Sequence, residues 1–167
     1  VGVKDFLKAA WPVAITAFTT RSSAGTLPVT MEKTLDDLNV SEEIAGFTLP
    51  LGATINMNGA ALNMTAFGIL AANACGVHLS PAQYAIAIFI CTISGIGVPG
   101  VPSGGLVLNL LLLSTLGLPA GLLGLITGID NLTDMICTAT NVVGDMVSSV
   151  IVDNSEKKKI QGGMENV

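Results

Sequence analysis

Charged residues are scarce in this 167-residue sequence, and a long central stretch has none. Asp, Glu, Lys and Arg make up 11% of the chain, against roughly a quarter in a soluble domain. Residues 44–129 contain no Asp, Glu, Lys or Arg. At about 20 residues per helix, a stretch of this length can cross a bilayer more than once. The sequence therefore predicts an integral membrane protein that contacts membrane lipid.

Other features of the composition exclude further classes of protein. Seven Lys and Arg stand against twelve Asp and Glu, so no basic surface for nucleic acid is expected. Half of the residues are hydrophobic, which excludes a disordered chain. The three cysteines lack metal-ligand spacing, and we expect Cys75 and Cys91 to be small buried side chains. The sequence starts with Val1 and shows no signal peptide, so we interpret it as the C-terminal part of a longer protein.

Polar and breaker residues divide the apolar sequence into segments of unequal length. Residues 1–43 hold a short apolar segment, a polar run at 21–28 and an acidic stretch, and they predict a re-entrant hairpin followed by a cytoplasmic loop. The pattern recurs in residues 82–120. There, glycines and prolines at 94–105 separate two short apolar segments, and we expect no helix to continue through them.

Each predicted hairpin precedes a segment long enough to span a bilayer. The first, 44–76, contains Asn-Met-Asn-Gly at 56–59, which predicts an interrupted transmembrane helix. The second, 121–153, is a long transmembrane helix with polar residues, followed by a cytoplasmic tail at 154–167. All five segments are expected to form one transport domain.

Lysine and arginine set the expected orientation. They lie near both ends of the sequence and are absent from the turns near 76–81 and 115–120, so both ends are expected in the cytoplasm. The two re-entrant helical hairpins then enter from opposite sides, as an inverted repeat in an all-α membrane fold. Paired, broken hydrophobic segments of this kind are typical of transporter binding sites.

The last predicted helix carries a polar stripe. At about 100° per residue, six positions fall within roughly one 100° sector: Asp130, Asp134, Cys137, Thr138, Asn141 and Asp145. A carboxylate at the bilayer centre costs about 2.5–3.5 kcal/mol, which a bound cation or ammonium group would offset. Hydrogen bonding to neighbouring helices alone would explain Asp130, near the helix start, better than the deeper Asp145.

The hairpin tips complement this stripe. Free backbone N–H groups and helix N-termini suit a carboxylate, and carbonyls exposed near Asn56 suit Na⁺. An amino acid carries both a carboxylate for the tips and an ammonium for Asp134.

Four motifs in order resemble the dicarboxylate/amino acid:cation symporter family, which includes glutamate transporters and their neutral amino acid relatives. They are Arg-Ser-Ser-Ala-Gly-Thr-Leu-Pro at 21–28, Gly-Ala-Thr-Ile-Asn-Met-Asn-Gly at 52–59, the glycine–proline tip, and the segment 128–145. The resemblance covers nearly the whole chain. It implies the transport-domain core of a plasma-membrane protein (the inner membrane in a bacterium), without the scaffold domain, and a homotrimer for the full-length family.

The resemblance also implies roles for matching positions. The substrate site would comprise Ser22, Ser23, Val101, Asp134, Cys137, Thr138 and Asn141. Ser23, the backbone around Val101 and the Asn141 side chain would hold the α-carboxylate, and Asp134 the ammonium. One sodium site would use Asp145 with backbone oxygens of Gly52, Asn56 and Asn141. A second would form near Thr54, Gly95, Ile96 and Val98. The second hairpin would be the extracellular gate, and the domain would move as an elevator.

Three positions depart from the family pattern. Cys137 stands where members for acidic substrates carry an arginine, and a thiol cannot make that bidentate pair. Arg21 is the alternative partner for an acidic side chain. Asn58 replaces an aspartate ligand of a third sodium site, which leaves the ion stoichiometry open. Ala60 replaces a threonine and suggests a less polar pocket.

The predicted function is sodium-coupled symport of a small neutral amino acid. The alternatives are an acidic amino acid or C4-dicarboxylate symporter, coupled to Na⁺ or H⁺, and an ion channel, against which two gated tips of opposite orientation argue. An enzyme is not expected, because Ser22 and Ser23 lack a nearby base.

Overall fold

The computed structural model describes residues 1–164, except the side chains of residues 125 and 161–164. This part of the chain is built from helices and contains no strand, in agreement with the predicted all-α class. In chain order the elements are α1 (Val3–Thr20), α2 (Ser23–Asp36), α3 (Glu42–Ile55), α4 (Asn58–Ala74), α5 (Pro81–Gly97), α6 (Leu106–Thr115), the 3-10 helix η1 (Ala120–Leu122) and α7 (Leu123–Met164).

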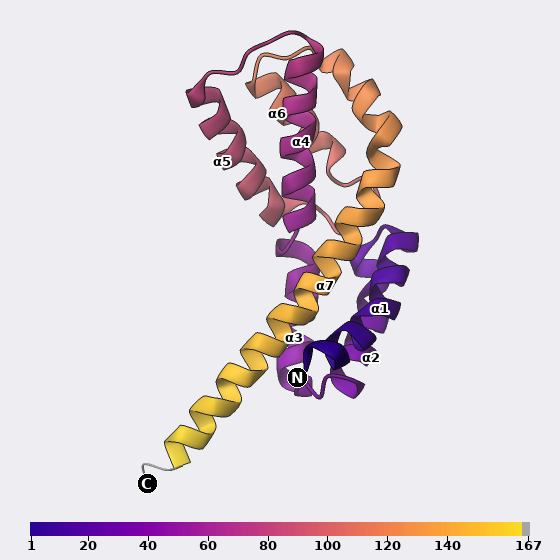
Figure 1. Cartoon of the computed structure of the whole chain (residues 1–167), viewed down its shortest axis with the longest axis vertical. Coiled ribbons are helices and arrows are strands. Elements are labelled where there is room, and N and C mark those ends of the chain that lie inside the picture. The colour runs from indigo at the N-terminus through magenta and orange to yellow at the C-terminus, as the bar shows by residue number, and fades with distance from the viewer. Residues whose placement is uncertain (165–167) are drawn as a thin grey trace.

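The longest helix, α7, runs past all the others (Figure 1). Its section Ile126–Ile160 is the one stretch in the described residues that is both long and apolar enough to cross a membrane. The apolar helices α5 and α6 are shorter than that. The helix continues beyond residue 153 through the first part of the predicted tail, and residues 165–167 lie outside the described part.

A two-residue turn separates α1 from α2. Arg21 adopts left-handed backbone angles with φ of 54°, and Ser22 caps α2 by accepting a hydrogen bond from the Gly25 N–H at 3.0 Å. The polar run at 21–28 is therefore helical from Ser23 onward. A good N-cap satisfies one of the free N–H groups of the first turn, which allows the helix to restart at once.

The second irregular segment, residues 98–105, separates α5 from α6. No helix continues through 94–105, as expected, and the break is shorter than the glycine–proline run because α5 extends to Gly97. Glycine costs a helix only about 1 kcal/mol per residue. Proline restricts the residue before it to extended angles, and Val98 accordingly has ψ of 122° ahead of Pro99.

The break between α3 and α4 falls on Asn56 and Met57, neither of which has helical backbone angles. The Met57 N–H, freed from the helix, donates to the Gly95 carbonyl of α5 at 3.2 Å. Backbone without helical hydrogen bonds is tolerated at membrane depth only where protein groups satisfy it. The end of α5 therefore stabilises the interruption.

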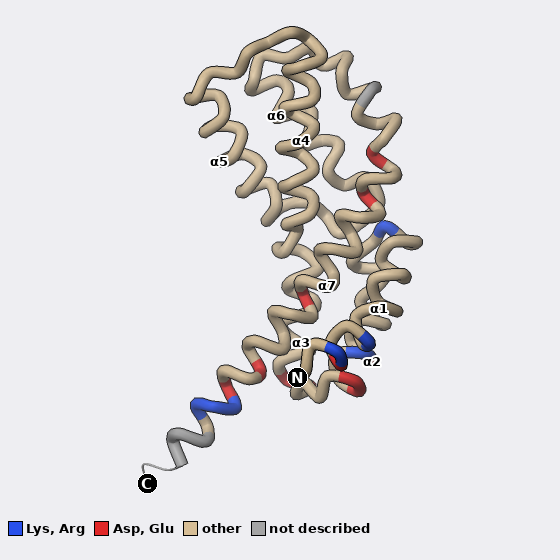
Figure 2. The backbone as a smooth tube through the Cα atoms, viewed as in Figure 1, with Lys and Arg blue, Asp and Glu red and all other residues tan. Residues whose placement is uncertain are grey.

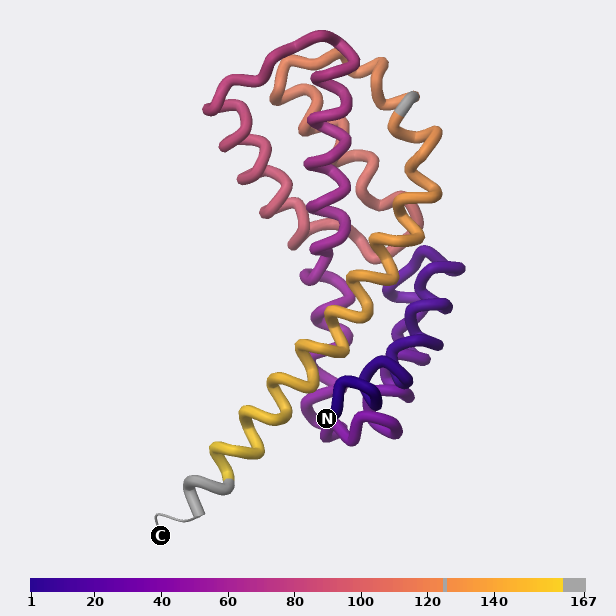
Figure 3. Tube along the Cα trace, viewed as in Figure 1, coloured from indigo at the N-terminus to yellow at the C-terminus, as the bar shows by residue number. Residues whose placement is uncertain are grey.

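Two hydrophobic clusters lie along α7, one toward each end of the molecule. The first joins α1, α3 and the middle of α7 with the loop after α2, through Ala9, Ala10, Val13, Ala17, Leu38, Val40, Ala45, Leu49, Val142 and Met146. The second joins α4, α5, α6 and the start of α7, through Met64, Phe67, Ala71, Ala72, Ala87, Cys91, Leu112, Leu113, Leu116, Leu118 and Ile126. Figure 3 shows the α1–α2 turn and the segment after α5 meeting α7 between these clusters.

The outer surface is unusually apolar. Large side chains such as Leu62 (71% exposed), Phe89 (66%) and Val107 (75%) lie open, as expected where lipid or another protein segment covers the surface. Most charged residues gather around the lower ends of α1, α2 and α7 in Figure 2. Cys91 is buried as predicted, but Cys75 is exposed, because α4 ends just before it.

Gly59 allows α4 to approach α7 closely. A Cβ atom there would lie 2.8 Å from both the Cα and the carbonyl oxygen of Cys137. We expect Gly59→Ala to destabilise the protein by about 1–3 kcal/mol, the usual effect of overpacking, measured by thermal unfolding in detergent. The control is Gly46→Ala on α3, where a Cβ meets nothing within 4 Å. Equal melting temperatures for the two variants would contradict the close α4–α7 packing.

Candidate functional site

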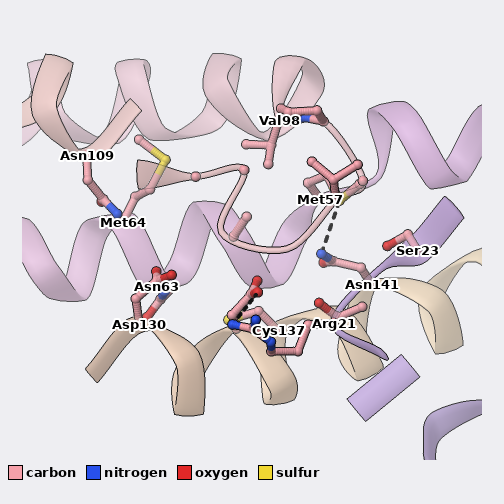
Figure 4. A pocket seen from close by; sticks show the side chains of 18 residues that line it. Arg21, Ser23, Met57, Asn63, Met64, Val98, Asn109, Asp130, Cys137 and Asn141 are labelled. Carbon is pink, nitrogen blue, oxygen red and sulfur yellow. Dashed lines mark hydrogen bonds and ion pairs between the residues drawn. The ribbon is translucent and has the colours of Figure 1, made fainter. Parts of the chain in front are cut away.

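A small cavity lies where the three irregular backbone segments meet α7 (Figure 4). Six of the seven predicted substrate residues line it: Ser23, Val101, Asp134, Cys137, Thr138 and Asn141. Its volume is about 30 Å³, which is room for about one or two water molecules. The cavity therefore cannot admit an amino acid until one of its walls moves.

Gly100, in the segment after α5, contacts the α1–α2 turn directly. Its carbonyl accepts hydrogen bonds from the Ser22 hydroxyl at 2.9 Å and from the Ala24 N–H at 3.3 Å. Ser22, the seventh predicted substrate residue, is not in the cavity lining, because its hydroxyl faces this contact and the α2 cap. A Cβ on Gly100 would lie 2.8 Å from the Ala53 carbonyl, so only glycine fits here without displacement.

Asp134 links α7 to the α1–α2 turn and to the segment after α5. Its Oδ2 accepts a hydrogen bond from the Ser103 N–H at 3.1 Å and lies 3.8 Å from the Arg21 guanidinium. Arg21 also donates to the Asn131 side-chain carbonyl. The carboxylate thus has one backbone donor and one cation within reach.

Asn141 connects the cavity to the α3–α4 break. It is 4% exposed, accepts a hydrogen bond from the Gly59 N–H at 2.7 Å, and donates to the Met57 sulfur at 3.2 Å. Thr138 is buried beside it, and Cys137 is half-buried. The amide of Asn141 therefore holds the break at Met57 and the first turn of α4 against α7.

Three residues of the first predicted sodium site come together in a groove outside the cavity. Gly52, Asn56 and Asp145 line one groove, and the Asn56 amide donates to Asp145 Oδ1 at 2.7 Å. Asp145 is 3% exposed, and among the described residues no ion pair involves it. A buried carboxylate among neutral oxygen and amide groups matches the preference of Na⁺ for oxygen ligands. Asn141, the fourth residue of this predicted sodium site, lines the cavity instead of this groove.

The second predicted sodium set is more dispersed. Gly95 and Ile96 line a groove between α4 and α5, whereas Val98 lines the central cavity. Thr54 lies on the surface, with its hydroxyl bonded to the Leu51 carbonyl at 2.7 Å. Asn58 lines the same groove as Gly95 and donates to the Asn56 side-chain oxygen at 2.6 Å, which links the two sets.

Sequence reasoning gave no site role to several residues that line the cavity: Asn63, Met64, Pro99, Gly100, Gly104, Gly105 and Asn109. Ala60, which was expected in the pocket, Asp130 of the polar stripe and Arg21, the alternative anion partner, also line it. One signal could have found Asn109, since it is the single polar residue among the first eight residues of the apolar helix α6. Asn63 follows the predicted break by a turn and faces the cavity because α4 packs on α7.

Comparisons with known proteins identify the family of the chain. A family model described as the sodium:dicarboxylate symporter family matches residues 1–155. An excitatory amino acid transporter of Caenorhabditis elegans is 41% identical over 152 residues, which are 91% of this chain and 30% of that protein. Mouse excitatory amino acid transporter 2 is 41% identical over 146 residues, 87% of this chain and 26% of that protein. The chain thus spans less than a third of the length of these relatives.

The contact at Gly100 is testable by hydrogen exchange. We expect Gly100→Ala to separate the two turns and raise the exchange rate of the Ala24 amide up to about tenfold, since a net hydrogen bond contributes about 0.5–1.5 kcal/mol. Gly105→Ala in the same segment, where a Cβ meets nothing within 4 Å, is the control. An unchanged exchange rate of the Ala24 amide in Gly100→Ala would show that the α1–α2 turn and the segment after α5 are not held together at this point.

Proposed function

This chain belongs to the sodium:dicarboxylate symporter family, and from that premise we propose that it forms the core of a sodium-coupled amino acid transporter. The observation that carries the proposal is the cavity, whose lining brings together carboxylates, the Arg21 guanidinium, the start of α2 and the backbone after α5. Such a set of groups complements a zwitterion. The family consists of transporters, and no catalytic role is proposed.

The substrate would be held at its two charged ends. Its carboxylate would take the position between Ser23, the N-terminus of α2 and the backbone near Val101, where helix N–H groups favour an anion. Its ammonium would bind Asp134 and compete there with Arg21, whose guanidinium lies 3.8 Å from the carboxylate. Thr138 and Asn141 would complete the lining.

Coupling to sodium would pass through the α3–α4 break. Asn56 binds Asp145 on one side of the interruption, and the next residue, Met57, contacts Asn141 in the cavity. A cation that binds at Asp145 with oxygens of Gly52 and Asn56 would order this segment and so shape the substrate pocket. Linkage then requires the substrate to raise sodium affinity by the same factor. The set around Thr54, Gly95, Ile96 and Val98 is proposed as a second ion site.

Transport would require movement of the wall formed by residues 98–105. This segment lacks helical hydrogen bonds over most of its length and closes a cavity too small for substrate. We propose that residues 1–43 and 82–120 are re-entrant hairpins of opposite orientation, that the second is the extracellular gate, and that the domain moves as an elevator. The C-terminal end of α7 would lie in the cytoplasm, and the full assembly would be a trimer in the plasma membrane.

The cavity geometry favours a neutral substrate. Among its lining residues, the two carboxylates Asp130 and Asp134 stand against one cation, Arg21. A neutral zwitterion leaves that balance unchanged, whereas an acidic amino acid adds a further negative charge in a poorly solvated space. Cys137 offers no positive partner for a side-chain carboxylate.

An acidic substrate is the second candidate, and two observations favour it. The relatives are named excitatory amino acid transporters, which suggests an acidic substrate over a small neutral one. Arg21 also lines the cavity, and a substrate ammonium bound to Asp134 would free its guanidinium for a bidentate pair with a carboxylate.

The proposal predicts sodium-driven uptake. The protein at its full encoded length, reconstituted in vesicles, should accumulate serine or aspartate only with an inward sodium gradient. Asp134→Asn should lower substrate affinity roughly 10- to 100-fold, because a hydrogen bond to a charged group is lost, whereas Asp5→Asn, on the exposed start of α1, should not. Uptake without sodium dependence would exclude sodium coupling, and steady currents without substrate would indicate a channel.

Substrate charge is tested at position 137. We expect Cys137→Arg to gain aspartate or glutamate transport at the expense of neutral amino acids, because it places a guanidinium in the cavity lining. Cys75→Arg, at an exposed position after α4, is the matched control. An unchanged substrate profile in competition assays would show that this position does not select charge.

A further inference from the structure

A hydrogen bond between two hydroxyl groups joins α3 to α7 outside the cavity. The Thr48 hydroxyl of α3 and the Ser149 hydroxyl of α7 lie 2.7 Å apart, and either of them can be the donor. That separation is the usual length of an O–H···O hydrogen bond. Ser149 is 0% exposed, so bulk water does not compete for its hydroxyl. The pair therefore bonds two helices that lie against each other (Figure 1).

Two hydroxyl protons serve three hydrogen-bond contacts in this pair. The Thr48 hydroxyl also lies 2.7 Å from the Ile44 carbonyl, and the Ser149 hydroxyl lies 2.9 Å from the Asp145 carbonyl. If Thr48 donates to Ser149, then Ser149 donates to Asp145. If Ser149 donates to Thr48, then Thr48 donates to Ile44. The bond between the helices is present in both arrangements, because each of them places one proton between the two hydroxyl oxygens.

Each hydroxyl lies one helical turn from a residue of the proposed sodium site. Gly52 follows Thr48 on α3, and Asp145 precedes Ser149 on α7, in each case by one turn. Gly52 and Asp145 are in close contact themselves, since a Cβ atom on Gly52 would overlap the Asp145 carboxylate. Thr48 also lines the groove that contains both of them. The hydroxyl bond is therefore the neighbour, along the same helix pair, of the contact that bears the carboxylate.

Apolar packing by itself does not set the offset between the two helices. Leu49 of α3 shares a hydrophobic cluster with Met146 of α7. Burial of apolar side chains is non-directional, so it tolerates a small shift of one helix along the other. A hydrogen bond weakens steeply as its angle falls, so it opposes such a shift. The bond between Thr48 and Ser149 therefore holds α3 at one height along α7.

A buried carboxylate holds the start of α3 to the same helix. Asp153 is 4% exposed and accepts hydrogen bonds from the Ser41 N–H at 3.0 Å and from the Ser41 hydroxyl at 2.8 Å. Ser41 is the N-cap of α3. Lys157, one turn further along α7, pairs with the same carboxylate. Because both the start and the middle of α3 are bonded to α7, the last turn of α3, with Gly52, extends from a fixed position.

We propose that Thr48 and Ser149 are positioning residues for the sodium site, which keep the oxygens of α3 at binding distance from the Asp145 carboxylate. The proposal rests on sodium coupling as the function and adds two residues that act through others. A set of ligands binds well only when neighbouring hydrogen bonds hold it in place to a fraction of an ångström. Neither residue lines the substrate cavity, so the pair affects the ion rather than the amino acid.

Loss of the hydroxyl bond should weaken sodium binding but not substrate binding. Calorimetric sodium titration of the protein at its full encoded length, at constant ionic strength, should give Ser149→Ala and Thr48→Val a sodium Kd roughly 3- to 10-fold above that of the wild type. In saturating sodium, the Kd of serine or aspartate should stay unchanged. The double variant should bind sodium no more weakly than either single variant, because both changes remove one bond. Thr48→Ser, which keeps the hydroxyl, should retain the wild-type sodium Kd.

Thr140→Ala on α7 is the matched control. The Thr140 hydroxyl donates to the Ile136 carbonyl at 2.9 Å, as Ser149 can to Asp145, but Thr140 is exposed and that bond stays within one helix. This variant should keep the wild-type sodium Kd.

The outcomes separate this inference from the function on which it rests. A wild-type sodium Kd in folded Ser149→Ala or Thr48→Val would overturn the positioning role, even if the melting temperature fell. Additive losses in the double variant, or a sodium Kd of Thr48→Ser as weak as that of Thr48→Val, would also overturn it. The two residues lie on different helices, so misfolding of one variant leaves the other as the test. Amino acid binding by the wild type that is independent of sodium would instead reject sodium coupling.

Discussion

The burial of carboxylates on α7 is the constraint on which the rest of this structure depends. Asp130 and Asp145 are almost fully buried in a helix that is otherwise apolar enough to span a membrane. A buried charge is tolerated only if donors or cations surround it. Regular helices cannot provide donors from their backbone, because their N–H groups are bonded internally. The interruptions in the chain therefore face α7, where unpaired N–H and amide groups are needed.

Each interruption supplies a specific group to this helix. The segment after α5 gives the Ser103 N–H to Asp134, and the break after α3 gives the Asn56 amide to Asp145 and the Gly59 N–H to Asn141. The α1–α2 turn brings Arg21 to Asp134. The α1–α2 turn contacts the segment after α5 through Gly100, and the α3–α4 break bonds to Gly95 at the end of α5, so displacement of one segment changes the surroundings of the others. This mutual dependence is the physical basis for the coupling that we propose between ions and substrate.

Much of the fold could be predicted from the sequence. The absence of charge from residues 44–129 indicates apolar surroundings, and Asn56 within an apolar segment indicates the break. Helical periodicity puts Asp134, Thr138 and Asn141 on one face, and all three line the cavity. The helix ends were harder to place. Ser22 restarts a helix within a polar run, and α5 continues through Gly95 and Gly97, because capping and neighbouring packing outweigh the intrinsic cost of these residues.

The sequence by itself determined that polar groups would be placed in an apolar helix and that irregular backbone would accompany them, since composition and periodicity are local properties. Only the tertiary structure decided which groups meet. Ser22 contacts Gly100 rather than the cavity, and Asn109 of α6 lines the same cavity as Asp130 of α7. The members of these pairs are 78 and 21 residues apart in the sequence, and their placement depends on how the helices pack around α7, which no local pattern encodes.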